Sequence, residues 1–558
     1  MIRLYKSLFF IFLFYSIGNL YAQDPLSHST FSHQDSLRGS NGMGRLYWDL
    51  LRYTITVTPD FESKTITGIN KIDFVDSGSA VIQIDLQEPM VIDSIKNNKS
   101  HYAFNREGNV YWVTLRSNKT NRNSFQPYKR SLTFFFHGKP KEAVNPPWDG
   151  GWIWKKDIHG NPWMSVACQG LGGSVWYPCK DIQSDEPNNG AILRIIVPDS
   201  LMGIGNGKLK EKKTIGKGKM LYTWQVVSPI NNYNIVPYIG KYSHFSDNYK
   251  GLKGNLSMDY WVLNDHLEKA KKQFADAPRM MKAFEYWFGP YPFYADGYKL
   301  VESPHLGMEH QSAIAYGNKF KNGYLGRDLS GSGWGLKWDF IIVHESGHEW
   351  FANNITTNDI ADMWVHEGFT NYSEVLFTEY YYGKEAGNDY AIGLRKNIDN
   401  DVPIIAPYGV NKEGSGDMYY KGANMIHLIR QVMNDDQKFR NILIGLNKQF
   451  FHKTVNTADV EDFINKESGK DFSTVFDQYL RTVKIPTLEY RFQDNLLKYR
   501  WINIVEGFNL PIKITIGKSD QPIWITPTKE WQSIPYNDAE KLISLDPNFY
   551  VRLLKNEE

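Results

Sequence analysis

Residues 343–348 read VHESGH, and a second segment with a glutamate, MWVHEGFTNYSE, follows at residues 363–374. If residues 339–351 form a helix, His344 and His348 lie one turn apart on the same face, where two imidazoles can bind one metal ion. Eighteen residues separate His348 from Glu367, and two antiparallel helices joined by a short link would bring this carboxylate to the same ion. The spacing therefore predicts a metal site.

The segment from His344 to His348 has the form H-E-x-x-H, the signature of zinc metallohydrolases. In a chain with 14 histidines, this pattern arises by chance only on the order of a few hundredths of a time. Two histidines, one carboxylate and one open position are the ligands of a catalytic zinc rather than a structural one. We predict that His344, His348 and Glu367 bind one Zn²⁺ per chain. The alternative is that they are unrelated polar residues on helix faces.

Other residues flank the predicted ligands. Glu345 can reach the same site from the side of the helix. Glu374 lies seven residues after Glu367 on the same helix face, so it can accept the outer N–H of a ligand histidine; a surface ion pair is the alternative. His366 points about 100° away from Glu367 and is not a predicted ligand. Gly347 costs about 1 kcal/mol relative to Ala inside a helix, so packing must hold this segment.

Composition indicates a folded, multidomain protein. The chain has 558 residues, of which 42% are hydrophobic and 22% charged, and its net charge is +2. This length predicts roughly three or four domains. The small net charge gives no indication of nucleic-acid binding or of a polybasic membrane-binding surface.

The N-terminus has the features of a secretory signal peptide at residues 1–22. Arg3 and Lys6 precede an apolar run, and Ala22 precedes the predicted cleavage point. An uncleaved anchor is the alternative, because Leu20 is larger than the residue usual at that position. No other stretch is apolar for the roughly 18 residues that a membrane span needs. We therefore predict an exported protein, periplasmic or secreted, with no stable membrane span after cleavage.

Cys168 and Cys179 are the only cysteines. A disulfide bond between them and a pair of buried free thiols are both compatible with an exported protein. Two cysteines are too few for a structural zinc site built from thiolates.

The periodicity of apolar residues predicts an α+β multidomain fold. Short alternating runs from residue 46 to 246 predict an N-terminal antiparallel β domain. Helical periodicity then dominates to about residue 483, beginning with a helix over residues 264–289. Alternating runs return after Pro486. The predicted domains are residues 23–247, a mainly helical catalytic domain at 248–485, and a small C-terminal β domain at 486–558.

The sequence resembles the M1 zinc aminopeptidases, the gluzincin group that includes leukotriene A4 hydrolase and aminopeptidase N. The H-E-x-x-H motif and the following glutamate carry the resemblance, together with GMEH at residues 307–310, YYKGA at 419–423 and ACQGLGGSVWYPCKD at 167–181. It covers about residues 46–485 and implies that the helical domain is thermolysin-like. It also implies zinc-dependent hydrolysis of peptides or proteins with a free N-terminus, and no nucleic-acid partner.

The resemblance implies a role for each matching residue. Glu345 would be the general base, and Tyr419 would donate its hydroxyl to the oxyanion. Tyr420 competes with Tyr419 for this role, because the family often has Glu at the second position. The carboxylate of Glu309 and the amide oxygen of Gln169 would accept the substrate's ammonium group.

The backbone edge at Gly307 and Met308 would pair with the peptide. His310 stands where the family usually has Asn, which alters the surroundings of the first side chain.

Two alternatives stay open at this point. A zinc endopeptidase of the H-E-x-x-H class would have no use for an ammonium site at Glu309 and Gln169. A catalytically inactive peptide-binding homologue would need neither Glu345 nor Tyr419. An epoxide hydrolase side activity is neither supported nor excluded by these residues.

Overall fold

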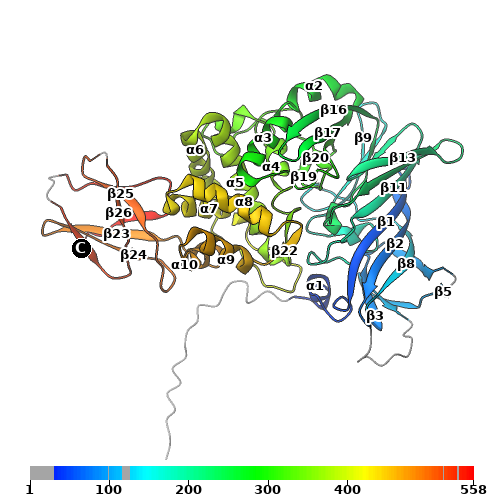
Figure 1. Cartoon of the computed structure of the whole chain (residues 1–558), viewed down its shortest axis with the longest axis horizontal. Helices are drawn as coiled ribbons and strands as arrows, with labels where there is room; N and C mark the ends of the chain where they lie inside the picture. The colour runs from blue at the N-terminus through cyan, green and yellow to red at the C-terminus, as the bar shows by residue number, and fades with distance from the viewer. Residues whose placement is uncertain (1–30, 99, 116–125, 520, 537–539, 558) are drawn as a thin grey trace, which may run out of the picture.

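The computed structural model describes residues 31–98, 100–115, 126–519, 521–536 and 540–557. A strand-rich part, a mainly helical part and a second strand-rich part follow one another along the longest axis (Figure 1). This order confirms the predicted α+β fold class. The predicted signal peptide lies outside the described residues and stays a prediction. Within the described ranges, every helix is too short or too polar to cross a membrane.

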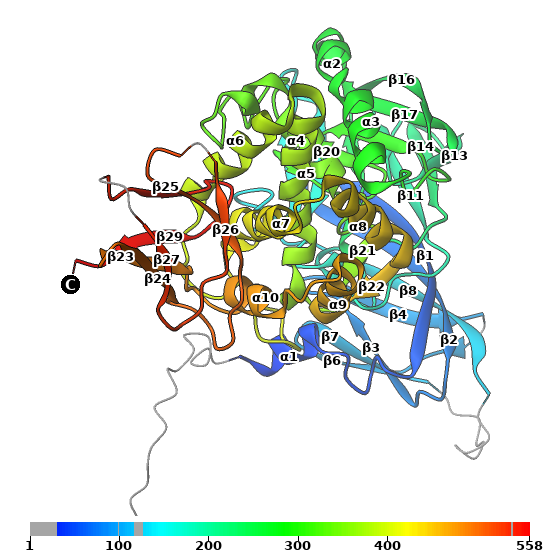
Figure 2. The ribbon, with the colours of Figure 1, turned by 60° about the vertical axis from the view of Figure 1, so that its left-hand side comes forward.

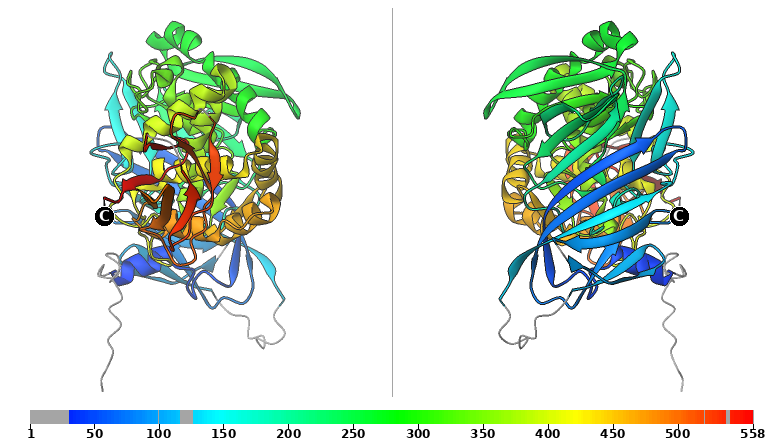
Figure 3. Two further views of the ribbon diagram at one scale, coloured as in Figure 1. Left: turned by 90° about the vertical axis from the view of Figure 1, so that its left-hand side faces the viewer. Right: turned by 90° about the vertical axis from the view of Figure 1, so that its right-hand side faces the viewer.

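A large twisted sheet dominates the N-terminal part, with the strand order β13-β14-β11-β1-β2-β8-β4-β5 (Figure 3, right). Its pairs are antiparallel except β1 with β11, which run parallel. Residues 61–190 lie between β1 and β11 and supply the long crossover that a parallel pair requires. The strands are β1 (Trp48–Asp60), β2 (Thr65–Asp76), β4 (Val91–Asn97), β5 (Ser100–His101), β8 (Tyr128–Gly138), β11 (Ala191–Pro198), β13 (Lys208–Thr214) and β14 (Lys219–Val226).

Two smaller sheets and a short helix complete this part. The sheets have the orders β3-β7-β6 and β12-β15-β10-β9. Cys168 and Cys179 lie here as buried free thiols, so they form no disulfide bond. The elements are α1 (His33–Gly39), β3 (Val81–Asp85), β6 (Phe104–Glu107), β7 (Val110–Thr114), β9 (Gly151–Lys156), β10 (Pro162–Ala167), β12 (Met202–Ile204) and β15 (Tyr238–Gly240).

The central part combines helices with a sheet of order β16-β17-β18-β20-β19 (Figures 1 and 2). The helices are α2 (Leu267–Gln273), α3 (Asp276–Phe288), α4 (Phe340–Gly347), α5 (Trp364–Tyr382), α6 (Lys384–Leu394), α7 (Tyr420–Met433), α8 (Asp436–Gln449), α9 (Thr457–Ser468) and α10 (Ser473–Leu480). The strands are β16 (Tyr242–Gly251), β17 (Gly254–Leu263), β18 (Tyr298–Glu302), β19 (Gly307–Met308), β20 (Ile314–Tyr316), β21 (Ile355–Thr357) and β22 (Lys453–Val455).

The structure corrects two sequence predictions in this region. The predicted helix over residues 264–289 is divided into α2 and α3. Pro278 lies in the first turn of α3 and cannot continue an incoming helix, because it lacks the N–H that would bond to Phe274. The predicted domain boundary after residue 247 cuts through β16, which belongs to the sheet of the central part. Its alternating pattern is indistinguishable in sequence from that of the preceding β domain.

The C-terminal part consists of two small sheets, with orders β27-β24-β23-β29 and β26-β25-β28 (Figure 2). Its strands are β23 (Thr487–Gln493), β24 (Leu496–Ile502), β25 (Ile512–Ile516), β26 (Ile523–Ile525), β27 (Gln532–Pro535), β28 (Ile543–Leu545) and β29 (Arg552–Lys555).

The junction between the N-terminal and central parts is itself packed. Val301 and Met308, from the central sheet, belong to the hydrophobic core of the N-terminal part. The edge of the central sheet at β19 therefore lies where the two parts meet.

Candidate active site

The two predicted histidine ligands lie on or directly after α4 (Phe340–Gly347), whose residues are all buried. The Asp339 side chain accepts hydrogen bonds from two backbone N–H groups of the first turn, which fixes the start of the helix. The helix ends at Gly347, earlier than predicted, and His348 follows with helical dihedral angles (φ −63°, ψ −20°). His344 and His348 therefore keep the one-turn spacing that the sequence predicts.

Gly347 lies at the closest approach of α4 and α5. A Cβ atom added to Gly347 would lie 2.5 Å from Oγ of Ser373 and 3.1 Å from Cγ2 of Thr370. Such distances leave no room for a side chain in a close-packed interior. Glycine at this position allows α5 to pass near the histidines, and Glu367 lies in the first turn of α5.

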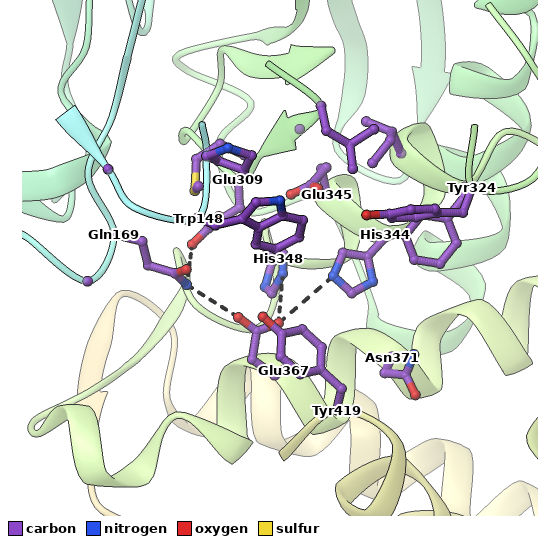
Figure 4. A pocket seen from close by; sticks show the side chains of 18 of the residues that line it. Trp148, Gln169, Glu309, Tyr324, His344, Glu345, His348, Glu367, Asn371 and Tyr419 are labelled. Carbon is purple, nitrogen blue, oxygen red and sulfur yellow. Dashed lines mark hydrogen bonds and ion pairs between the residues drawn. The ribbon is translucent and has the colours of Figure 1, made fainter. Parts of the chain in front are cut away.

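The carboxylate of Glu367 faces both histidines (Figure 4). Its Oε2 atom is 3.3 Å from Nε2 of His348 and 3.9 Å from Nε2 of His344. The ligand atoms of these side chains lie within 4.8 Å of one another, and all of the side chains are buried. Two helices thus bring the predicted ligands to one point.

The outer nitrogen of each histidine is held by another group. Nδ1 of His344 lies 2.7 Å from Oε1 of Glu374. Nδ1 of His348 lies 3.1 Å from the backbone oxygen of Phe351. These contacts leave both Nε2 atoms directed at Glu367 and set the ring tautomer required of a metal ligand.

The chemistry of this group fits zinc. Oε2 of Glu367 is buried and, among the described residues, accepts no hydrogen bond of ordinary geometry. Burial would raise the pKa of Glu367, but the neighbouring histidines, His348 above all and then His344, together outweigh burial and lower the pKa to about 2. An ionised, unsatisfied oxygen beside two imidazole nitrogens suits a cation. Two nitrogens and one oxygen are the donor set of a catalytic zinc site.

Glu345 faces the same space from α4. A Cβ atom added to Gly307 would lie 2.4 Å from Oε1 of Glu345, so the carboxyl group rests against the backbone of β19. Burial raises the pKa of Glu345 to about 7, against the opposing effect of His344 and His348. A carboxyl group with a pKa near neutrality can both accept and release a proton.

Glu309 and Gln169 meet where the N-terminal and central parts join. Nε2 of Gln169 donates to Oε1 of Glu309 at 2.8 Å and to Oε1 of Glu367 at 3.3 Å. The hydroxyl of Tyr233 donates to the same Glu309 oxygen at 2.8 Å. Gln169 therefore turns its amide nitrogen toward the two carboxylates. Its acceptance of the ammonium group through the amide oxygen stays a prediction. In this orientation Gln169, together with Tyr233, holds the Glu309 side chain in place.

Glu309 follows β19, which is the terminal strand of its sheet. Gly307 and Met308, the predicted peptide-binding edge, line the same cavity. One ligand atom each of Glu309, Glu345 and His348 lies within 4.8 Å of the others. The carboxylate of Glu309 is therefore about one amino-acid residue away from the metal ligands.

Tyr419 and Tyr420 both line the cavity at the start of α7. Burial raises the pKa of Tyr419, and the nearby charge of Glu367 raises it further. Burial also raises the pKa of Tyr420, to about 12, but the charge that adds to this effect is that of Glu374. Figure 4 shows Tyr419 beside Glu367. Of the two tyrosines, Tyr419 is therefore the one whose hydroxyl faces Glu367.

Two further histidines have partners outside the ligand group. Nε2 of His366 accepts a hydrogen bond from the backbone N–H of Thr357 at 2.9 Å. Nδ1 of His310 lies 2.5 Å from the hydroxyl of Tyr238. Both contacts are with the protein's own buried groups, so neither side chain is directed to the Glu367 carboxylate.

The predicted metal ligands line a cavity of about 560 Å³, together with Glu345, Glu309, Gln169 and the two tyrosines. Trp148 and Glu413 also line it, and sequence analysis missed both. Trp148 is 67% exposed and lies in front of the ligands in Figure 4. Both residues come from loops, where spacing carries no information about direction. The only sequence signal is the presence of an aromatic and an acidic residue near the recognised motifs.

Residues 274–479 match the family described as "Peptidase family M1 domain". The chain contains an M1 domain. The predicted ligands His344, His348 and Glu367 all lie within the matched range, as do Glu345 and Tyr419. The M1 domain is thus the part of the chain that carries the predicted chemistry.

Known proteins resemble the chain beyond this domain. Leukotriene A-4 hydrolase from Xenopus laevis is 23% identical over 390 residues, which are 64% of this chain and 60% of the relative. Alanine/arginine aminopeptidase from Saccharomyces cerevisiae is 21% identical over 474 residues, 81% of this chain and 54% of the relative. The chain thus matches only part of the length of these relatives.

Among solved structures, the M1 zinc metallopeptidase from Deinococcus radiodurans shares the fold, with a TM-score of 0.65 and 19% identity. The match covers 79% of this chain and 96% of that one. A variant of that protein has been solved with a Tyr-Ser-Ala substrate, again with a TM-score of 0.65. The likeness shows that the fold of the M1 metallopeptidases extends over most of the chain.

Proposed function

We propose that the protein is a zinc-dependent aminopeptidase that removes the first residue of peptides and proteins with a free N-terminus. The main support for this proposal is the position of the Glu309 carboxylate. This carboxylate is buried, is held by Gln169 and Tyr233, and lies within 4.8 Å of Glu345 and His348. A substrate ammonium group at Glu309 leaves room for a single residue before the scissile bond reaches the base.

His344, His348 and Glu367 would hold the metal. Bound there, Zn²⁺ would act as a Lewis acid that polarises the scissile carbonyl and increases the acidity of water. We propose one ion per chain, because the two candidate ligand groups share His348. Glu374 and the backbone oxygen of Phe351 would keep the histidines oriented.

The remaining residues have separate roles in the reaction. Glu345 takes the proton of the attacking water and gives it to the leaving amine, for which a pKa of about 7 is well placed. Tyr419 donates its hydroxyl hydrogen bond to the oxygen on which negative charge develops. The free edge at Gly307 and Met308 aligns the peptide backbone across the ligands.

We also propose that the protein acts outside the cytoplasm. The support is the charged, apolar and small-residue order of residues 1–22. Sequencing the N-terminus of the protein purified from its native host tests this directly. A chain that begins at Gln23 supports export, and a chain that begins at Met1 contradicts cleavage.

The function is tested by following release of the first residue from a peptide with a free N-terminus. Activity should disappear with a zinc chelator and return with added Zn²⁺, because the buried triad fits that ion. Glu345→Gln should still bind zinc yet lose about 10²- to 10⁴-fold in kcat, because the amide cannot move a proton. Full activity in the chelated protein, or in Glu345→Gln, would contradict the proposal.

A further inference from the structure

A second cavity of about 510 Å³ lies next to the proposed active site. Leu306 lines both cavities, and Pro146 lines the second while its neighbour Pro147 lines the first. Trp163 and Phe320 give the second cavity apolar walls. The two cavities thus adjoin at Leu306 and the proline pair.

Positive groups surround the second cavity. Lys269 and Lys319 line it, and among the described residues neither forms an ion pair with a carboxylate. Glu302, the acidic residue of its lining, is already engaged. One of its oxygens lies 2.6 Å from Nδ1 of His266, and the other accepts the backbone N–H of Leu263 at 2.8 Å. The cavity therefore presents uncompensated positive charge.

His305 adds a buried polar group to the same lining. It is only 5% exposed, and within the described residues neither of its ring nitrogens makes a hydrogen bond of ordinary geometry. Burial lowers the pKa of His305 to about 4, so its ring is neutral and adds no positive charge to the cavity.

The proposed active site has the opposite character. Glu309, Glu345, Glu367 and Glu413 all line it. One cavity is thus suited to a positive group and its neighbour to a negative one. A short peptide with free ends carries these two charges at its two termini.

The edge strand β19 fixes the direction of a peptide between the cavities. Glu309, at the proposed ammonium site, directly follows its end, and Leu306 directly precedes its beginning. A peptide held at Glu309 and paired with Met308 and Gly307 must run antiparallel to β19, toward Leu306. At about 3.4 Å per residue, the distance of three residues from Glu309 to Leu306 is about 10 Å. The fourth residue of the peptide would therefore enter the second cavity.

We infer that the second cavity binds the C-terminal carboxylate of short peptides through Lys269 and Lys319, and that the preferred substrates are peptides of about four to six residues with a free carboxyl terminus. This inference rests on the proposed aminopeptidase function, which sets the position of the N-terminus. Two cationic side chains at the cavity rim match a carboxylate, and the apolar walls match the side chain that precedes it.

Affinity measurements on the Glu345→Gln protein loaded with zinc test the inference. The peptide Leu-Ala-Ala-Ala is compared as free acid and as C-terminal amide by calorimetry. The acid should bind about fivefold to tenfold more tightly, the size expected for two partly exposed ion pairs. The acid and amide of the dipeptide Leu-Ala should bind alike, because a dipeptide ends before Leu306.

Variants that lack single positive charges test whether Lys269 and Lys319 cause the preference for the free acid. Adding Lys269→Gln and Lys319→Gln together should reduce the difference between acid and amide tetrapeptide to less than about twofold. Adding Lys321→Gln, which removes a nearby exposed lysine outside the cavity lining, should preserve it. Equal affinity for acid and amide, or a preference that survives the double substitution, would overturn the inference.

The result of this affinity test can be distinguished from a failure of the proposed aminopeptidase function. Affinity is measured whether or not the wild-type protein releases leucine from the same peptides. An absence of turnover would count against the aminopeptidase, while the comparison of acid and amide would still decide the role of the second cavity.

Discussion

Nδ1 of His344 lies 2.7 Å from Oε1 of Glu374, and Glu374 is itself completely buried. The other oxygen of Glu374 accepts a hydrogen bond from the hydroxyl of Tyr390 at 2.7 Å. Tyr390 thus holds the Glu374 carboxylate in place, and the carboxylate in turn orients the His344 imidazole. The orientation of the first ligand is set by contacts that reach well beyond the metal site.

Replacing Glu374 with Ala should weaken zinc binding about 10- to 100-fold, because the His344 ring loses the acceptor that orients it. Competition with a chromogenic chelator measures this. Glu379→Ala is the matched control, since Glu379 lies on the same helix but pairs with Arg430. An unchanged zinc affinity in Glu374→Ala would show that the contact does not support the ligand.

Gly347→Ala should destabilise the protein by about 1 to 3 kcal/mol, because the new methyl group would overlap with Ser373. Urea unfolding of the metal-free proteins measures the change without a contribution from zinc. Gly416→Ala is a suitable control, because no atom lies within 4 Å of the added Cβ there. Equal stability of the two variants would mean that α4 and α5 approach less closely than described.

Tyr419→Phe should lower kcat about 10²- to 10³-fold with little change in KM, because the lost hydrogen bond forms mainly in the transition state. Tyr420→Phe should cost far less, since the carboxylate charge that acts on its hydroxyl is that of Glu374 and not that of Glu367. Steady-state kinetics with one peptide compares them. The reverse order of losses would assign the oxyanion role to Tyr420.

The pH dependence of the protein's stability should reveal the contribution of protonated His266. The hydrogen bond to Glu302 raises the pKa of His266 despite partial burial, with Asp265 adding to and Lys269 opposing the shift. Because the folded-state pKa is raised, this contribution is complete below the unfolded value of about 6.5 and is lost as the pH rises through the folded value. His266→Gln should therefore destabilise the protein more at about pH 5.5 than at about pH 9. Thermal unfolding at both values checks this, and an equal loss at both would contradict it.

Sequence spacing predicted the convergence of His344, His348 and Glu367, because helical periodicity fixes direction over one or two turns. The same reasoning placed Glu374 behind the ligands. It did not predict the central sheet, whose strands β18, β19 and β20 are too short to show a clear alternation.

The sequence also could not predict where a side chain points when the residue lies in a loop. Trp148 and Glu413 reach the cavity from loops, and only tertiary packing decides where they point. The orientation of the Gln169 amide could not be predicted from the sequence for a related reason. Its choice between oxygen and nitrogen depends on Glu309 and Glu367, which are far away in sequence but adjacent in space.

The most direct test of the aminopeptidase assignment compares one peptide with a free and with an acetylated N-terminus, and identifies the products by mass spectrometry. We expect the wild-type protein to release only the first residue, and only from the free form. Glu309→Gln should reduce kcat/KM for the free form by about 10- to 100-fold, because the ammonium loses its charged acceptor. Internal cleavage of both forms would contradict this account and indicate an endopeptidase.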